Sequence, residues 1–175
     1  MTEIYIVVTQ TGTVLSRLLK VITKADYNHV SLSTEPDLGI LYSFGRKNAY
    51  NPFWGGFVRE SPHFGTFKRF SKTQAVVLAI PVTEEVCEEI KVRLEEMYCR
   101  RKEYRYDTLG LLLAWIKILY VRKNTYYCSS FVLDFLKEYG LTEGVSFERF
   151  PKPIEFLNLS GEVIYRGRLQ DFTKK

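Results

Sequence analysis

The chain begins with a run of apolar and β-branched residues that predicts a buried strand. Ile4 to Thr9 reads IYIVVT, and a continuous run of this length is typical of a strand covered on both faces. The segment 13–25 then places apolar residues at helical spacing, with Thr13 as a suitable N-cap. We therefore expect a strand followed by a helix.

Alternating polar and apolar positions next predict a β-hairpin. The sequence HVSLS, which begins at His29, carries polar residues at every second position, the pattern of a half-buried strand. Residues 35–38 contain Pro and precede Gly39, so they read as a turn. Residues 40–44 then form the returning strand.

The middle of the chain changes composition before regular patterns return. Residues 45–65 are rich in Gly, Pro, Asn and aromatic residues, which favours a long irregular loop. Thr66 to Phe70 and Ala75 to Val82 read as two further strands. A helix is expected from Thr83, with acidic residues in its first turns and basic residues in its last.

Two more helices and one strand are expected in the last third of the chain. Residues 109–119 are nearly all apolar, can be capped by Asp107 or Thr108, and are too short to span a bilayer. They suit a buried helix or, alternatively, an interfacial helix that makes peripheral membrane contact. A helix from Cys128 to Gly140 and a strand over 161–168 complete the pattern. The fold class is α+β, a mainly antiparallel sheet packed against helices in a single domain spanning residues 1–175.

Composition and charge narrow the functional classes. Apolar residues make up 46% and charged residues 26%, the net charge is +5, and aromatic residues reach 15%. The aromatic surplus suits a thick core or a cleft for an apolar ligand. The basic run CRRKEYRY, residues 99–106, suits a solvated helix end or a patch for anionic polymers or lipid headgroups. It is too short to indicate nucleic acid as a partner.

The sequence lacks the motifs of nucleotide-binding and metal sites. The chain has no glycine-rich phosphate loop and no His/Cys cluster with metal-ligand spacing, so we expect no cofactor and no metal. Cys87, Cys99 and Cys128 form neither an even disulfide set nor a CxxC pair. Together with an N-terminus that lacks the features of a signal peptide, they predict a cytoplasmic protein.

Cys128 has two interpretations. It begins the apolar stripe of its own helix, which continues through Phe131, Val132, Phe135, Leu136 and Tyr139. That position is typical of a small buried hydrophobe. A cysteine in the first turn of a helix also lies at the positive end of the helix dipole, which stabilises a thiolate and an oxyanion.

A nucleophilic cysteine needs a base, and the chain has two histidines. His29 opens a strand, which holds an imidazole more rigidly than the loop that carries His63. A third group usually fixes the imidazole. A three-residue turn at 35–37 would place Ser43 opposite His29, and a slip of one residue would bring Tyr42 or Phe44 there instead. Ser43 is therefore the first candidate and Tyr42 the second.

The order of these motifs resembles a known family. NHVSLS precedes YYCSSFVLDFL, and IYIVVTQTGTVLSRLLKVIT, YDTLGLLL and PKPIEFL lie around them. Over roughly residues 3–157 the chain looks like the circularly permuted branch of the NlpC-type papain-like cysteine hydrolases. That branch is the YiiX-like group, which is related to lecithin–retinol acyltransferase-like enzymes. In the permuted branch the histidine precedes the cysteine.

The resemblance implies a permuted papain-like fold with Cys128 as the nucleophile and His29 as the general base. The family's third polar residue would fall around Tyr42 or Ser43, where relatives often have Glu or His and this chain has neither. The expected function is a thiol hydrolase that cleaves an amide bond of a peptide-like or acyl-amide substrate. We expect four aromatic residues to contact the substrate: Tyr42, Trp54, Tyr126 and Tyr127. A lipid acyltransferase or phospholipase, or an inert binding module, are the alternatives.

Overall fold

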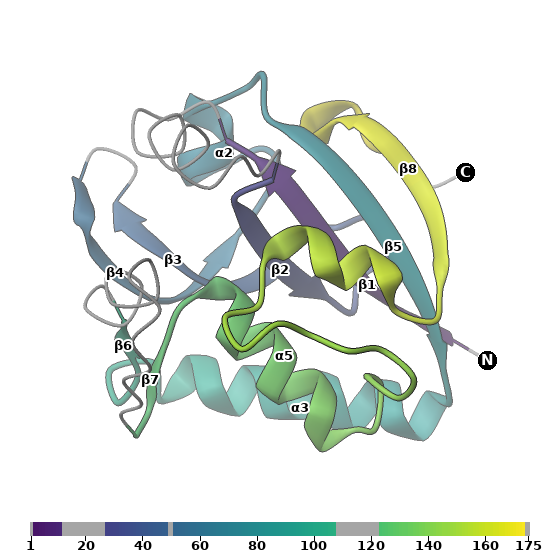
Figure 1. Ribbon diagram of the computed structural model, residues 1–175. Helices are drawn as coiled ribbons and strands as arrows, with labels where there is room; N and C mark the ends of the chain where they lie inside the picture. The colour runs from purple at the N-terminus through teal and green to yellow at the C-terminus, as the bar shows by residue number, and fades with distance from the viewer. Residues whose placement is uncertain (1, 12–26, 49–50, 108–122, 174–175) are drawn as a thin grey trace.

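The centre of the protein is a six-stranded sheet in which every neighbouring pair is antiparallel. The computed structural model describes residues 2–11, 27–48, 51–107 and 123–173. The strand order is β4-β3-β2-β1-β5-β8 (Figure 1). The strands are β1 (Thr2–Gln10), β2 (His29–Ser33), β3 (Leu41–Asn48), β4 (Asn51–Glu60), β5 (Gln74–Val82) and β8 (Glu162–Arg168). The predicted α+β class with a mainly antiparallel sheet is therefore confirmed.

The helices are distributed over the two faces of the sheet. They are α2 (Gly65–Arg69), α3 (Glu84–Cys99) and α5 (Cys128–Glu138), with the short 3₁₀ helices η1 (Pro153–Asn158) and η2 (Leu169–Asp171). A small parallel pair, β6 (Arg105–Tyr106) with β7 (Thr125–Tyr126), leads into α5. In Figure 1, α3 and α5 lie on the same side of the sheet, with η1 above α5. The helices expected over 13–25 and 109–119 lie outside the described residues.

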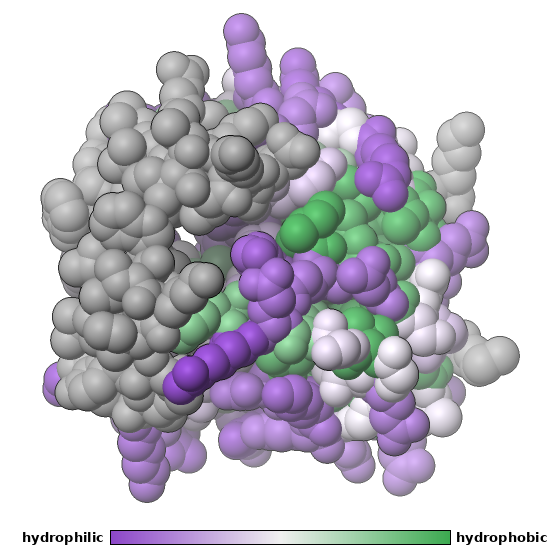
Figure 2. Space-filling model, in the orientation of Figure 1, coloured by the Kyte–Doolittle hydropathy of each residue, from purple (hydrophilic) through white to green (hydrophobic). Residues whose placement is uncertain are grey.

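Apolar residues line both faces of the central strands, so the sheet has two cores. Ile4, Ile6 and Val8 of β1 pack under α3 and α5, whereas Tyr5 and Val7 pack against α2, β8 and η2. Burial of β1 on both sides follows from its uninterrupted apolar sequence. On the face in Figure 2, apolar residues are still visible between η1 and β8, with polar residues around them.

Two local predictions are wrong. Residues 51–60 form strand β4 instead of part of a loop, because they pair with β3 along its length. Thr66 to Phe70, expected as a strand, instead cover the single-turn helix α2 and its C-cap Phe70. Phe67 is the residue that α2 buries.

The hairpin exists but its register differs from the prediction by two residues. Leu32 pairs with Tyr42, whereas a three-residue turn at 35–37 would pair Leu32 with Ile40. The connection is longer because side chains hold its ends: Ser33 Oγ donates to the Ile40 carbonyl at 2.7 Å, and the Ile40 N–H donates to Glu35 Oε2 at 2.9 Å. A shift of two residues keeps each side chain on its predicted face.

Three further features bear on the sequence predictions. Among the described residues, no helix is both long and apolar enough to cross a membrane. All three cysteines are free. Cys87 and Cys99 both lie on α3, as their spacing predicted.

Candidate active site

Cys128 is the first residue of α5, as its sequence predicted. Tyr127 is the N-cap with extended backbone angles, and the Tyr127 N–H donates to Ser130 Oγ at 3.0 Å, which fixes the first turn. The predicted stripe anchors the helix, because Phe131, Val132, Phe135 and Leu136 are all buried. The first backbone N–H groups of a helix have no intrahelical acceptor, so those around Cys128 can stabilise a negative charge.

The thiol lies where a helix terminus, a histidine and a backbone N–H converge. Burial alone would raise the pKa of the Cys128 thiol, but a hydrogen bond and the charge of His29 outweigh burial and lower it. The backbone N–H of Val30 and the hydroxyl of Ser129 lower it further. Cys128 is 9% exposed and belongs to the core cluster on the helix side of the sheet.

His29 opens β2 and contacts both Cys128 and a carboxylate. Its Nε2 lies 2.7 Å from Glu60 Oε2. Burial lowers the pKa of His29, but the charge of Glu60 and the hydrogen bonds to Cys128 and Glu60 raise it to about 10. A raised histidine pKa beside a lowered thiol pKa is the signature of a thiolate–imidazolium pair.

Glu60 is the third member of this cluster, and the sequence did not point to it. It ends β4, within the segment expected to be a loop. Among the described residues, Glu60 is the only one whose carboxylate bonds to His29. β3 lies between β2 and β4, so the backbones that carry the two residues are about 10 Å apart. The two long side chains meet by reaching across the intervening strand.

A glycine on β3 provides the space in which they meet. A Cβ added at Gly45 would lie 3.1 Å from Glu60 Oε1 and 3.2 Å from a methyl group of Val58. A glycine inside a strand often marks a close approach of this kind. Ser31 completes the cluster, because its Oγ donates to Glu60 Oε2 at 3.2 Å and lies 3.3 Å from His29 Nε2.

The structure does not bring either predicted third residue to His29. Ser43 is fully buried and donates to the Val30 carbonyl at 2.7 Å. Tyr42 lies on the helix face of the sheet, where its hydroxyl donates to Glu95 of α3. The two-residue shift of the hairpin and the reach of Glu60 explain both outcomes. His63, the other histidine, is exposed beyond β4.

The residues expected at the substrate lie in different places. Trp54 is 57% exposed on β4. Tyr126 packs into an aromatic cluster with Phe44, at 5.1 Å between ring centroids. Tyr127 lies near the thiol, since burial and then the charge of Cys128 raise the pKa of its phenol. Tyr106 shares that environment: burial and then the charge of Cys128 raise its pKa too, although the sequence had marked it only as part of a basic run.

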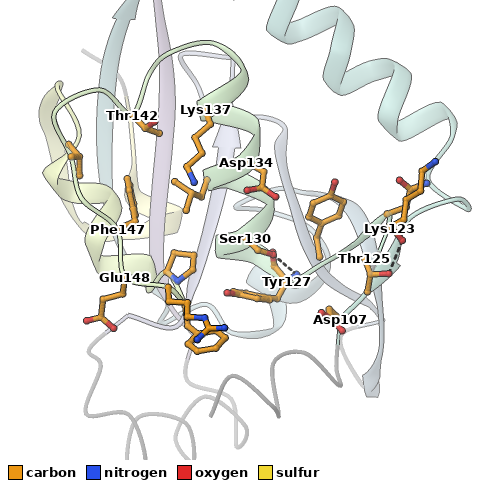
Figure 3. Close-up of a pocket in the computed structure, with 17 residues that line it drawn as sticks. Asp107, Lys123, Thr125, Tyr127, Ser130, Asp134, Lys137, Thr142, Phe147 and Glu148 are labelled. Atoms are coloured by element: carbon orange, nitrogen blue, oxygen red, sulfur yellow. Dashed lines mark hydrogen bonds between the residues drawn. The ribbon is translucent and has the colours of Figure 1, made fainter. Parts of the chain in front are cut away.

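A cavity of about 680 Å³ opens along α5 beside this site. In Figure 3, Tyr127 and Ser130 of the first turn lie at its wall, with Phe147 and Glu148 of the following loop on another side. Its volume is in the range of small-molecule sites. Neither Cys128 nor His29 lines it, so the cavity adjoins the thiol site through Tyr127 and does not surround the sulfur.

Comparison with known proteins adds no relative: no family model, no curated protein and no solved structure matches the chain.

Proposed function

We propose that the protein is a thiol hydrolase that cleaves an amide bond through a Cys128 thioester. The observation that carries this proposal is the pairing of Glu60 with His29, whose charge in turn lowers the pKa of the Cys128 thiol at a helix N-terminus. Nucleophile, base and orienting carboxylate in that arrangement are the parts of a catalytic triad. A buried structural cysteine would need none of them.

The reaction begins with the thiolate that His29 stabilises by holding the thiol proton. The sulfur attacks the carbonyl carbon, a C–S bond forms, and the carbonyl electrons move to the oxygen. The backbone N–H of Cys128, at the N-terminus of α5, stabilises this oxyanion. When the intermediate collapses, the C–N bond breaks and His29 gives its proton to the leaving amine.

Water completes the cycle. His29, now neutral, removes a proton from a water molecule that attacks the thioester carbonyl. The C–S bond breaks, the acid leaves, and the sulfur departs as a thiolate while the proton stays on His29, which restores the starting pair. Glu60 orients the ring of His29 and stabilises the imidazolium at both stages. A carboxylate does this better than the hydroxyl of Ser43 would, because its charge opposes that of the imidazolium.

The order of these residues supports a permuted papain-like fold for the chain. The histidine opens β2, the carboxylate ends β4, and the cysteine begins α5. The permuted branch has the histidine before the cysteine, and Glu60 supplies the acidic member that is missing around Tyr42 and Ser43.

The proposal is tested by the pH dependence of thiol alkylation with iodoacetamide, followed by peptide mass spectrometry. Cys128 should react much faster than Cys87 and Cys99 at neutral pH, and His29→Ala should abolish the difference. His63→Ala is the matched control and should change nothing. Equal rates for all three cysteines would contradict the nucleophile and favour an inert binding module, in keeping with the low exposure of Cys128.

Catalysis itself is tested with para-nitrophenyl acetate and with acyl anilides. The wild-type protein should accumulate an acyl adduct on Cys128, detected by intact mass, and Cys128→Ser should not. Acyl transfer to a lysolipid in vesicles, without amide cleavage, would instead identify the lipid acyltransferase of the alternative proposal.

A further inference from the structure

Arg46 lies beside the proposed catalytic residues and has no role in the mechanism above. It follows Gly45 on β3 and pairs with Gly55 of β4. Tyr106 packs on Gly55 so closely that an added Cβ would lie 2.6 Å from its ring. Burial lowers the pKa of Arg46, while the charges of Tyr106 and Glu60 act against that shift. The guanidinium is therefore within electrostatic range of two groups of the thiol site.

Phe70 brings a second guanidinium close to Arg46. The guanidinium carbon of Arg46 lies 5.8 Å from the centroid of the Phe70 ring, and that of Arg69 lies 5.5 Å from the same centroid. Each cation gains a favourable contact with the ring, but the two cations repel each other, and Arg69 lowers the pKa of Arg46.

Arg46 also differs from the other arginine of the same hairpin. Arg59 forms an ion pair with Glu95 and lies 3.9 Å from the Tyr98 ring centroid. Arg46 is half-buried, and no described residue accepts a hydrogen bond from it or lies at ion-pairing distance. A partly desolvated guanidinium that no carboxylate bonds directly is costly, and a bidentate oxyanion is the ligand that suits its geometry.

We propose that Arg46 recognises an oxyanion of the substrate, a carboxylate or a phosphate attached near the scissile bond. This inference rests on the proposed function, because it assigns the substrate class of the same site. The substrate is then an anionic acyl amide: its reacting carbonyl lies at Cys128 while its charged group lies on Arg46, with Phe70 and Arg69 next to it.

Two alkylating agents that differ in charge test this. Iodoacetate carries a carboxylate and iodoacetamide is neutral, and both react by the same displacement of iodide by the thiolate. The fraction of Cys128 present as thiolate affects both rate constants equally, so it cancels in their ratio. We expect Arg46→Gln to lower that ratio by about tenfold, the value of one charge-assisted hydrogen bond, and Arg46→Lys to lower it less. Arg166→Gln, on β8 at the far edge of the sheet, is the matched control and should leave it unchanged.

The source of the oxyanion is decided by competition. If acetate slows the reaction of Cys128 with iodoacetate more than inorganic phosphate does, the substrate carries a carboxylate. The reverse order indicates a phosphate. An unchanged ratio in Arg46→Gln overturns the proposal even if Cys128 is highly reactive.

A direct titration separates this inference from the proposed function. Inorganic phosphate, followed through the amide signals of Gly45 and Gly55, should shift them in the wild-type protein and not in Arg46→Gln. If Cys128 proves no more reactive than Cys87 and Cys99, the proposed function fails and this titration alone decides the anion site. Absent or identical shifts in both proteins would then reject the site as well.

Discussion

Glu60 Oε2 and His29 Nε2 lie 2.7 Å apart although a whole strand separates the backbones that carry them. The contact depends on Gly45, which leaves the space above β3 open. It converts a histidine whose burial would lower its pKa into one whose pKa is raised to about 10. The thiolate character of Cys128 therefore depends on a residue of β4.

Replacing Glu60 with Gln tests that dependence. Glu60→Gln keeps a hydrogen-bond acceptor and removes the charge, so the pKa of His29 should fall and that of Cys128 should rise. We expect alkylation of Cys128 at neutral pH to slow by about tenfold, the effect of one pKa unit. The measurement is the pH–rate profile with iodoacetamide. Glu95→Gln, which removes a carboxylate from α3, should leave the profile in place; an equal slowing there would refute a specific role for Glu60.

The raised pKa of His29 also predicts how stability depends on pH. The ordinary value is 6.5 and the folded value is about 10, so the folded state holds the proton more tightly. The contribution of His29 to stability is then complete below pH 6.5 and is lost as the pH rises towards the folded value. The free energy of unfolding of wild type minus that of His29→Gln should shrink over this interval.

Urea denaturation at a series of pH values measures this difference. Both proteins are best compared in a Cys128→Ala background, because the titration of the thiol changes the free energy of unfolding with pH in the opposite direction. Its lowered pKa contributes stability that is present above its ordinary value of 9.0 and is lost as the pH falls through the folded value. Without the thiol, the charge and the hydrogen bond of Glu60 remain to raise the pKa of His29 against burial. A difference that grows with pH would contradict the assignment.

Ser31 is expected to act by positioning the carboxylate. Its Oγ donates to Glu60 Oε2 at 3.2 Å, so Ser31→Ala should slow Cys128 alkylation by about fivefold, the worth of one ordinary hydrogen bond. The pH–rate profile should move in the same direction as in Glu60→Gln. Ser33→Ala is the control: Ser33 is equally buried on β2 but donates to the Ile40 carbonyl, so its loss should lower stability and leave the thiol rate unchanged.

Gly45→Ala should reproduce part of the Glu60→Gln effect without touching a titratable group. The new methyl group would lie 3.1 Å from Glu60 Oε1, so the carboxylate must move away from His29. Residues that act through one contact do not contribute additively. The double variant Gly45→Ala/Glu60→Gln should therefore react no more slowly than Glu60→Gln alone. Additive losses would show that Gly45 acts on something other than this carboxylate.

Tyr42→Phe tests whether Tyr42, a residue predicted to orient His29, contributes to the thiol site beside Glu60. The Tyr42 hydroxyl donates to Glu95, on the face of the sheet that α3 covers. Its removal should lower the free energy of unfolding by about 1 kcal/mol, as for a typical hydrogen bond, measured by urea denaturation. The alkylation profile of Cys128 should not change. A slower thiol in a protein of unchanged stability would restore Tyr42 to the site.

The sequence determined those features that depend on local patterns. A helix that begins at Cys128 follows from the stripe of apolar residues after it, and a strand that begins at His29 follows from period-two alternation. Both patterns identify the right element, because the spacing of apolar residues follows the face that each element turns to the helix-side core. The strand is buried on both faces rather than half-buried, since Ser31 and Ser33 are as inaccessible as Val30. The face of Ser43 was also predicted correctly, since a register shift of two residues preserves it.

Only the tertiary structure decided which residue orients His29. β4 was missed because Pro52, Gly55 and Gly56 weaken the strand pattern, and the pairing with β3 that stabilises this strand cannot be read from its own sequence. Gly55 also has a tertiary reason, since the Tyr106 ring occupies the place of a side chain there. The meeting of Glu60 and His29 over Gly45 joins three strands. Such a contact is set by the order and register of strands, and these depend on how the whole sheet packs.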